Sequence, residues 1–378
     1  MSRHFSSPPR LVMGEGALEE VAAELPRLGT RGLIVTDPGI MAAGIHGLVR
    51  GILGRDFPVE TFSGVVGNPD IATVEAADEA RRAAGADVLI AIGGGSSIDV
   101  AKSAALLGTN GGGIADYEGV DRFDKRPLPV VVVPTTVGSG SEVTKGAVIT
   151  NPDTHVKMVV VSDLMFATIA VLDARVVEGL PGRIAATTGM DALTHAIEAY
   201  VAKGANPVTD ALCLGAIEII GKNLVPASRG DKTALYNMLV ASSMAGIGFH
   251  DAGLGAVHAL ANTLGAQFGV HHGTANALFL PYVIDFNIPA APERFARIAA
   301  ALGEEVAGLA PAKAALRASA AVHRLAEETG VPRHLSDVGV GADAIPALAR
   351  DALTQADLPG NPREVTLADL TDLYTKAL

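Results

Sequence analysis

Four side chains in the second half of the chain have the types and spacing of ligands for one metal ion. They are Asp191, His195, His258 and His272. Asp191 and His195 are four residues apart in an apolar, helix-like segment, so on a helix their side chains lie one turn apart on the same face. Imidazole and carboxylate groups bind Fe²⁺, Zn²⁺ and other divalent transition metals. Two interpretations follow from the spacing: a shared metal site, or ordinary core and surface histidines.

The histidine pair that completes the set needs a change of chain direction. His258 and His272 are 14 residues apart, and an unbroken helix would separate them by about 21 Å. Gly265 and Gly269 stand between them, and glycine adopts the left-handed conformations that end helices. We therefore expect a turn within LGAQFGVHHG that brings both imidazoles to the other pair.

Three consecutive glycines in the first half indicate a site for a phosphate group. Gly93–Gly95 in AIGGGSSIDVAK stand between a strand-like run and a helix-like run, where N–H groups at a helix start attract anions. The alternative is a tight turn without a ligand. The motif is not a P-loop, because Ala101 precedes Lys102. The G-x-G-x-x-G fingerprint is also absent, because its third glycine is missing after GEG at 14–16 and GSG at 138–140.

A second strand end carries hydroxyl groups that suit the other parts of a dinucleotide. It is the segment VVVPTTVGSGSEVT at 131–144, in which hydroxyl residues surround flexible glycines. We expect these groups to complete a diphosphate or nicotinamide site in the same sheet as the first glycine turn. The hydroxyl residues are Thr135, Thr136, Ser139, Ser141 and Thr144.

Asp37 ends the apolar run RGLIVTD and has two interpretations. A carboxylate at this place accepts hydrogen bonds from ribose hydroxyls and repels a 2′-phosphate, which favours NAD over NADP. The alternative is a residue that caps a turn or a short helix, and the following Pro38-Gly39 supports that role.

The elements that must position these residues differ between the two halves. In residues 1–180, short apolar runs alternate with amphipathic helical segments, which predicts an α/β domain with a parallel sheet. The segments KGAVITN and KMVVVSD are expected to form a hairpin or to extend the sheet. The expected strands are 31–37, 86–95 and 128–136, and the expected helices are 73–85 and 96–108.

Residues 181–378 show a succession of Ala- and Leu-rich helical patterns, which predicts a second, all-helical domain. The length of 378 residues also favours two domains. The expected helices are 183–203, 208–222, 233–248, 253–265, 293–302 and 312–329.

Composition narrows the class of protein. The net charge is −12 and no Lys/Arg-rich run interrupts it, which argues against binding to nucleic acid or an anionic membrane. The single cysteine, Cys213, lies in a helical run where an inert buried thiol is expected, which is compatible with a reducing compartment. The N-terminal segment lacks the apolar core of a signal peptide, and no stretch has the length of a transmembrane helix. We expect a cytoplasmic protein.

Taken together, these motifs resemble those of the iron-containing, group III alcohol dehydrogenases. GGGSSIDVAK, PTTVGSGSEVT, D-x3-H, GLGAVHALANTLGA and HHGTANALFLP occur in the family's order, and the resemblance extends from GEGALEE to NPREVTLADLTDLY. It implies an N-terminal dinucleotide-binding α/β domain, an all-α C-terminal domain and a cleft between them. This architecture is shared with dehydroquinate synthase. The family also implies a dimer or a larger homo-oligomer.

The resemblance also implies roles for single residues. The metal, Fe²⁺ by family, would be held by Asp191, His195, His258 and His272, although the same donors would fit Zn²⁺ or another divalent metal. The implied cofactor is NAD, with NADP less favoured. Its implied binding positions are Asp37, Gly94, Gly95, Ser96, Asp99, Thr135, Thr136, Ser139, Thr144 and Lys157.

The chain departs from the family pattern beside the metal ligands. Asn262 stands where many relatives have a histidine credited with proton relay or substrate contact, and an amide does not titrate near neutral pH. His271 is the other imidazole candidate for that role, although many relatives have proline there; water and the cofactor ribose are the alternative. Phe249 and His250 are expected either to border the substrate pocket or to pack one helix on another.

The predicted reaction is metal-dependent hydride transfer between NAD(P)(H) and a small primary or secondary alcohol, or its aldehyde or ketone. A divalent ion with three neutral imidazoles and one carboxylate keeps a positive charge and acts as a Lewis acid toward the substrate oxygen. The reaction needs no nucleophilic residue, so the sequence predicts no catalytic residue beyond the metal ligands.

Other functions stay open at this stage. Within the family they are a hydroxyacid–oxoacid transhydrogenase and a lactaldehyde or diol reductase. A dehydroquinate-synthase-like lyase would need basic residues for an acidic substrate, and the motifs contain few Lys or Arg. The alternative outside catalysis is a protein with a structural metal or a nucleotide-sensing role.

Overall fold

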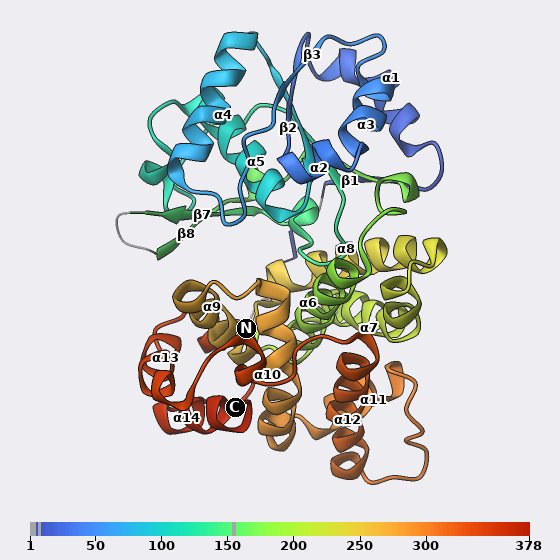
Figure 1. Cartoon of the computed structure of the whole chain (residues 1–378), viewed down its shortest axis with the longest axis vertical. Coiled ribbons are helices and arrows are strands. Elements are labelled where there is room, and N and C mark those ends of the chain that lie inside the picture. Colours follow the sequence, from blue (N-terminus) through green and yellow to red (C-terminus); the bar gives the residue numbers. More distant parts are fainter. Residues whose placement is uncertain (1–4, 7–8, 153–155) are drawn as a thin grey trace. The chain divides into compact units, whose positions relative to one another are not determined.

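The computed structural model describes residues 5–6, 9–152 and 156–378, which belong to two compact units. One unit comprises Ser6–Thr136 and Gly140–Gly179 and contains the sheets; the other contains Val137–Ser139 and Leu180–Leu378 and is helical (Figure 1). The short segment Val137–Ser139, from the second glycine loop, thus packs with the helical unit.

A parallel sheet of six strands, in the order β1-β9-β6-β4-β2-β3, forms the centre of the first unit. Every residue of β4 and β6 is buried, which explains why these strands read as uninterrupted apolar runs. The predicted parallel α/β fold is confirmed. The strands are β1 Arg10–Met13, β2 Gly32–Val35, β3 Val59–Phe62, β4 Val88–Gly93, β6 Val130–Pro134 and β9 Ile169–Leu172.

A second sheet of three strands, in the order β5-β8-β7, belongs to the same unit. Strands β7 and β8 are antiparallel, so the two β-branched segments expected as a hairpin or a sheet extension form an antiparallel pair. The strands are β5 Gly119–Val120, β7 Gly146–Asn151 and β8 Val156–Val161.

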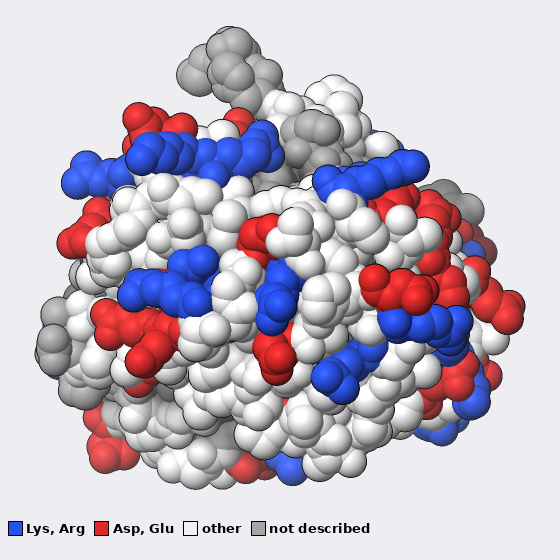
Figure 2. Space-filling model, turned by 90° about the horizontal axis from the view of Figure 1, so that it is seen from above, with Lys and Arg blue, Asp and Glu red and all other residues white. Residues whose placement is uncertain are grey.

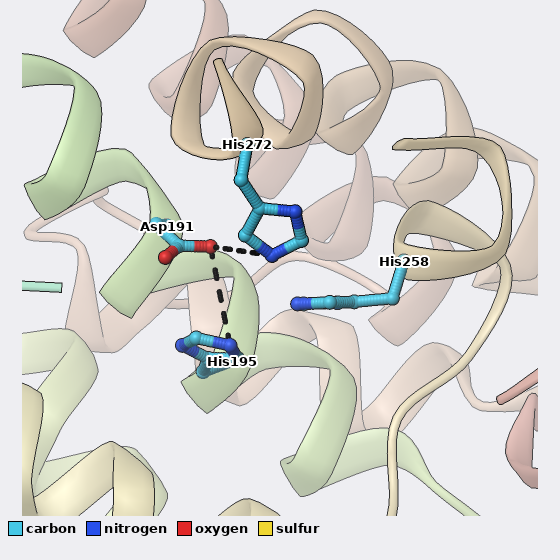
Figure 3. Close-up of side chains that lie close together, drawn as sticks. All are labelled: Asp191, His195, His258 and His272. Carbon is cyan, nitrogen blue, oxygen red and sulfur yellow. Dashed lines mark ion pairs between the residues drawn. The ribbon is translucent and has the colours of Figure 1, made fainter. Parts of the chain in front are cut away.

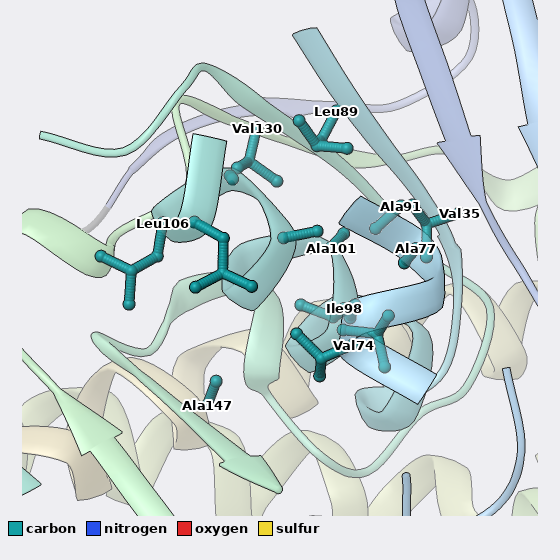
Figure 4. Packing of buried hydrophobic residues seen from close by; sticks show 14 of the residues in the cluster. Val35, Val74, Ala77, Leu89, Ala91, Ile98, Ala101, Leu106, Val130 and Ala147 are labelled. Atoms are coloured by element: carbon teal, nitrogen blue, oxygen red, sulfur yellow. The ribbon is translucent and has the colours of Figure 1, made fainter. Parts of the chain in front are cut away.

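The core of this unit lies between the sheets and two helices. Helix α5 has buried residues on all sides, and its Ile98 and Ala101 join Leu89 of β4 and Val130 of β6 in one apolar cluster, which also includes Ala147 of β7 (Figure 4). A helix with buried residues on all sides is expected in a core. The helices of the unit are α1 Ala17–Leu28, α2 Pro38–Ala42, α3 Ile45–Leu53, α4 Ile71–Ala84 and α5 Gly95–Asn110.

The helical unit is built around α6, which is buried from Ala185 to its last residue. Its neighbours include α7, α8 and α10. The helices are α6 Gly182–Val201, α7 Pro207–Ser228, α8 Lys232–Ala252, α9 Ala256–Phe268, α10 His272–Asn287, α11 Pro292–Ala301, α12 Pro311–Thr329, α13 Ile345–Ala352 and α14 Leu367–Lys376.

Sequence patterns missed one helix that matters for function. Helix α10 starts at His272 and is buried continuously from Gly273 to Pro281. Its sequence therefore lacks the helical spacing of apolar and polar residues from which the other helices were predicted. It also contains a proline, Pro281. Short strands such as β1, β3 and β9, of four residues each, were missed for lack of a pattern long enough to recognise.

Two features of the described residues bear on contacts with membranes and charged partners. Within the described part of the chain, no helix combines the length and the apolar character needed to cross a membrane. On the face shown in Figure 2, acidic and basic side chains are interspersed, and the blue groups do not merge into one continuous patch.

Candidate active site: a metal centre and two glycine loops

Asp191, His195, His258 and His272 converge in the helical unit. One potential ligand atom from each lies within 4.8 Å of the others. The first two residues come from α6, the third from α9 and the fourth from α10, and their side chains point toward a common space (Figure 3). Three imidazoles and a carboxylate fit a divalent transition metal.

The helices bring these side chains together as the spacing predicted. The i, i+4 pair on α6 places His195 Nε2 3.9 Å from Asp191 Oδ1, and α10 places His272 Nε2 3.6 Å from the same oxygen. Helix α9 ends at Gly269, whose φ of 66° is left-handed. The turn expected within LGAQFGVHHG is confirmed; of its two candidate glycines, Gly265 lies inside α9 and Gly269 ends the helix.

Glu198 fixes the orientation of His258. Its Oε2 lies 2.5 Å from His258 Nδ1, and its Oε1 accepts a hydrogen bond of 2.7 Å from the Val257 N–H at the start of α9. A proton held on Nδ1 leaves Nε2 as the lone-pair atom that faces the cluster, the arrangement of a carboxylate–histidine–metal triad. Burial opposes the charged form of His258, but the Glu198 hydrogen bond and charge raise its pKa above the usual value.

A backbone carbonyl does the same for His195. His195 Nδ1 lies 3.2 Å from the Gly138 carbonyl oxygen, which leaves Nε2 for a metal. A Cβ on Gly138 would lie 2.4 Å from the Thr188 carbonyl oxygen, so only glycine brings this carbonyl so close to α6. Burial lowers the pKa of His195 to about 4, and the neutral ring is the form that binds metals.

Asn276 lies at the centre of the cluster. Its Nδ2 is 2.6 Å from Asp191 Oδ1, 3.1 Å from His272 Nε2 and 3.3 Å from His258 Nε2. Its Oδ1 is buried and has no hydrogen-bond partner among the described residues. One NH₂ group, which carries a partial positive charge, thus contacts three of the four donor residues. Because their lone-pair atoms all face this group, the same donor set fits a cation.

The cluster is open on one side. The side chain of His272 is 34% exposed, whereas those of Asp191, His195 and His258 are each below 10%. A metal held here would have protein on most sides and access from the His272 side, as a catalytic rather than a closed structural site requires.

Of the residues expected near the ligands, the structure brings one into contact with them. The Phe249 ring stacks on the His195 ring with centroids 4.3 Å apart. His250 turns back to its own helix, where Nδ1 lies 3.2 Å from the Gly246 carbonyl oxygen. Asn262 donates to Asp357 Oδ2 at 3.2 Å, and His271 is exposed at the start of α10.

In the α/β unit, Gly93–Gly95 form the turn between β4 and α5. Gly93 has a φ of 156°, and a Cβ there would lie 2.5 Å from Ser97 Oγ. A Cβ on Gly94 would lie 3.2 Å from Thr136 Cγ2 in the loop after β6. The turn therefore offers backbone N–H groups at the start of a helix, as a phosphate site does.

Asp37 lies beside this turn and also caps a helix. Its Oδ1 accepts a hydrogen bond of 3.0 Å from the Ile40 N–H of α2, as the capping interpretation required. Its Oδ2 lies 3.4 Å from the Ser97 hydroxyl oxygen at the start of α5. Capping and ribose binding are thus compatible, because each uses a different oxygen.

The other expected cofactor residues are distributed over several elements. Thr135 is buried directly after β6, and its hydroxyl has no partner in the part of the chain that the structure describes; Lys157 lies on β8. Asp99 instead accepts hydrogen bonds from protein groups, the Ser141 hydroxyl and the Val148 N–H. Ser139 belongs to the helical unit.

Sequence reasoning missed the residues that orient the ligands. Glu198 is one turn after His195, and Asn276 is one turn after His272, so both could have been found as polar residues on the ligand faces of apolar helices. Gly138 carried no signal, because its partner lies 57 positions away in the sequence.

Comparison with known proteins covers both units. Residues 8–174 match the model of the iron-containing alcohol dehydrogenases, and residues 185–378 match that of the C-terminal part of the Fe-containing alcohol dehydrogenase family. The chain is 39% identical over 379 residues to NAD-dependent methanol dehydrogenase of Bacillus methanolicus, with 99% of this chain and 100% of the relative covered. It is 39% identical over 368 residues to lactaldehyde reductase of Escherichia coli K12, with 96% of each covered.

Solved structures agree along the whole chain. The crystal structure of a 1,3-propanediol oxidoreductase superposes with a TM-score of 0.97 at 37% identity and covers 100% of both chains. An alcohol dehydrogenase from Oenococcus oeni gives 0.97 at 33% identity, again over 100% of both chains.

Proposed function

The chain belongs to the iron-containing alcohol dehydrogenase family, and on this basis we propose that Asp191, His195, His258 and His272 hold a catalytic divalent ion, Fe²⁺ by family. The observation that carries the proposal is the convergence of these four donors from three helices within 4.8 Å. Two of the imidazoles have their Nδ1 atoms held by protein groups, which leaves Nε2 for the ion. The exposed side of His272 leaves room for a substrate oxygen.

We propose NAD as the second cofactor, bound through the glycine turn at Gly93–Gly95 and the loop after β6. Three features support this assignment: the backbone N–H groups at the start of α5, the unpartnered Thr135 hydroxyl, and Asp37 beside the turn. The name of the Bacillus methanolicus relative specifies NAD. The Asp37 carboxylate repels a 2′-phosphate, so we expect NAD to be preferred over NADP.

The protein's own groups prepare the reaction. When bound, a divalent ion supplies Lewis acidity toward the substrate oxygen, and the nicotinamide ring takes or gives the hydride. Glu198 and the Gly138 carbonyl keep two imidazoles in the tautomer with a free Nε2. Phe249 covers one face of the His195 ring and limits access of water on that side. The Asn262 amide does not titrate near neutral pH, so with a cofactor bound the proton would pass to another group, and His271, water and the cofactor ribose are the alternatives.

We propose a small aliphatic alcohol or its aldehyde as the substrate. Relatives with nearly equal identity are named for methanol, lactaldehyde and 1,3-propanediol, all short molecules. Lactaldehyde and short diols are therefore the first compounds to test. The lyase alternative gains no support, because these relatives are dehydrogenases and reductases.

The test of this function is NADH oxidation with a panel of short aldehydes after anaerobic reconstitution with Fe²⁺ or Zn²⁺. We expect turnover only with metal, a loss of about a thousandfold or more in His195→Ala, and no change in the exposed, remote His334→Ala. Metal-independent turnover, or an equally active His195→Ala protein, would contradict the assignment.

We further propose that the protein is a homodimer or a larger multiple, as the family resemblance implied, and that it is cytoplasmic, as its composition suggested. The buried free thiol of Cys213 is compatible with a reducing compartment. Light scattering of the purified protein and fractionation of its source cells would test the two statements; a monomer or an exported protein would refute them.

A further inference from the structure

Helix α5, which starts at the first glycine turn, carries two charged side chains in a buried environment. Asp99 and Lys102 are three residues apart, so they lie on the same side of the helix. Lys102 is only 1% exposed. Burial raises the pKa of Asp99 and lowers that of Lys102 to about 8, so the lysine remains mostly protonated at neutral pH. Buried charges are costly without partners, and the partners here indicate a role.

The Lys102 ammonium group binds backbone carbonyls of one short segment. Its Nζ donates to the carbonyl oxygens of Ser141 at 2.6 Å, Thr144 at 2.7 Å and Gly146 at 3.2 Å. An ammonium group has three N–H donors, and these three carbonyls account for all of them. Lys102 therefore acts on the chain rather than on a ligand.

Asp99 holds the same segment from the same helix. The Ser141 hydroxyl donates to its Oδ1 at 2.5 Å, and the Val148 N–H donates to its Oδ2 at 3.0 Å. Hydrogen bonds to ionised groups are stronger than those between neutral groups. Together the two side chains fix Ser141–Val148 against the helix that begins at Gly95.

The fixed segment carries or supports two candidate cofactor residues. Thr144 lies within it, and its carbonyl oxygen is one of the acceptors of Lys102. Strand β7 begins in the segment and pairs with β8, where Thr150 is the register partner of Lys157. The β7–β8 pairing thus links the position of Lys157 to the segment that Asp99 and Lys102 hold.

We propose that Asp99 and Lys102 are positioning residues of the dinucleotide site, which set the distance between the first glycine turn and the loop that carries Thr144. The inference rests on the proposed function, since it takes NAD to span both loops. It gives Asp99 a role through Ser141 and Val148 in place of the direct cofactor contact that the family resemblance implied. The first glycine turn precedes both residues on α5, and within the described residues their hydrogen bonds go to Ser141–Val148 rather than to the turn.

Calorimetric titration of the metal-loaded protein with NADH and, separately, with AMP tests this proposal. AMP carries the phosphate expected at Gly94–Gly95 but has no nicotinamide half. In Lys102→Met we expect the Kd of NADH to rise about tenfold or more, because charge-assisted hydrogen bonds hold the loop. The Kd of AMP should change by less than about threefold, and bound metal should be unchanged. Ser141→Ala removes one Asp99 partner and keeps the carbonyl that Lys102 binds, so a smaller rise for NADH is expected.

The possible outcomes distinguish a failure of the proposed function from a failure of the positioning role. If the wild-type protein does not bind NADH, the proposed function fails. If it binds NADH and Lys102→Met binds NADH equally well, the positioning role is overturned. Equal weakening of NADH and AMP, with a lower Tm, would show general damage to the α/β unit and would also overturn it. If Lys102→Met does not fold, Ser141→Ala decides by the same ratio of NADH to AMP affinity.

Discussion

The metal cluster and the glycine loops differ in the groups that they offer to a ligand. The cluster uses side chains: four donors from three helices, two of them oriented by further groups at 2.5 and 3.2 Å. The loops use the backbone, with Gly93 at a φ of 156° and a helix start that offers N–H groups. Charged side chains contact these loops through their backbone; Lys102, for example, donates to the Ser141 carbonyl oxygen.

This difference determines what each region tolerates. A side-chain site concentrates its binding energy in a few atoms, so single substitutions should have large effects on metal and small effects on nucleotide. A backbone site depends on the shape of the chain, so substitutions there should be milder and should leave the metal in place. The predictions below test this contrast, from the largest expected effect to the smallest.

Glu198→Gln should weaken metal binding about 10- to 100-fold, because Glu198 holds the proton on His258 Nδ1 and makes the ring a better donor. It should also change the pH dependence. Glu198 raises the pKa of His258, so in the wild-type protein protons compete with the metal already above the usual histidine range, and affinity falls as the pH drops through that raised value.

In Glu198→Gln the pKa of His258 should fall, so the loss of metal on acidification should begin at a lower pH. Metal titrations between about pH 5.5 and 8 would show both effects. A variant with the wild-type affinity and the wild-type midpoint would mean that Glu198 does not orient this ligand.

Gly94→Ala should raise the KM for NAD about tenfold with unchanged metal content. The added Cβ would lie 3.2 Å from Thr136 Cγ2, in the space where the two loops approach each other. The φ of −81° at Gly94 is open to alanine, so the fold should survive. Gly67→Ala is the matched control, because a Cβ there meets nothing within 4 Å. Equal effects of the two substitutions on KM would break the contrast.

Asp37→Ser should give the smallest effect, a rise of about fivefold in the preference for NADP relative to NAD. The serine hydroxyl can still cap α2, whereas the negative charge that repels a 2′-phosphate is lost. The measurement is kcat/KM for the two cofactors with the same alcohol. An unchanged ratio would leave Asp37 with its capping role alone.

The sequence predicted those features that leave a local pattern. Asp191 and His195 were recognised because a helix gives side-chain spacing a direct spatial meaning. Strands β2, β4 and β6 of the parallel sheet were recognised from apolar runs, whereas β1, β3 and β9 were missed. The turn expected within LGAQFGVHHG is present, and Gly269 is the glycine that ends the helix. Helix α10 escaped because its burial on all sides removes periodicity.

The groups that orient the ligands were harder to predict, since their partners come from distant positions. Glu198 meets His258 over 60 residues of sequence, and Gly138 meets His195 over 57. No local pattern encodes such contacts. For Asp99 the local pattern was misleading. Its place in the GGGSSIDVAK motif suggested a direct contact with the cofactor, whereas its hydrogen bonds are with Ser141 and Val148.

The central claim is that one divalent ion is held by the Asp191–His195–His258–His272 cluster, and titration of the metal-free protein with Co²⁺ tests it most directly. The visible spectrum of bound Co²⁺ reports its ligands independently of turnover. We expect saturation at one Co²⁺ per chain in the wild-type protein, and a loss of that absorption in His258→Ala with NADH binding retained. Saturation of His258→Ala at the same ratio with the same spectrum would contradict the account.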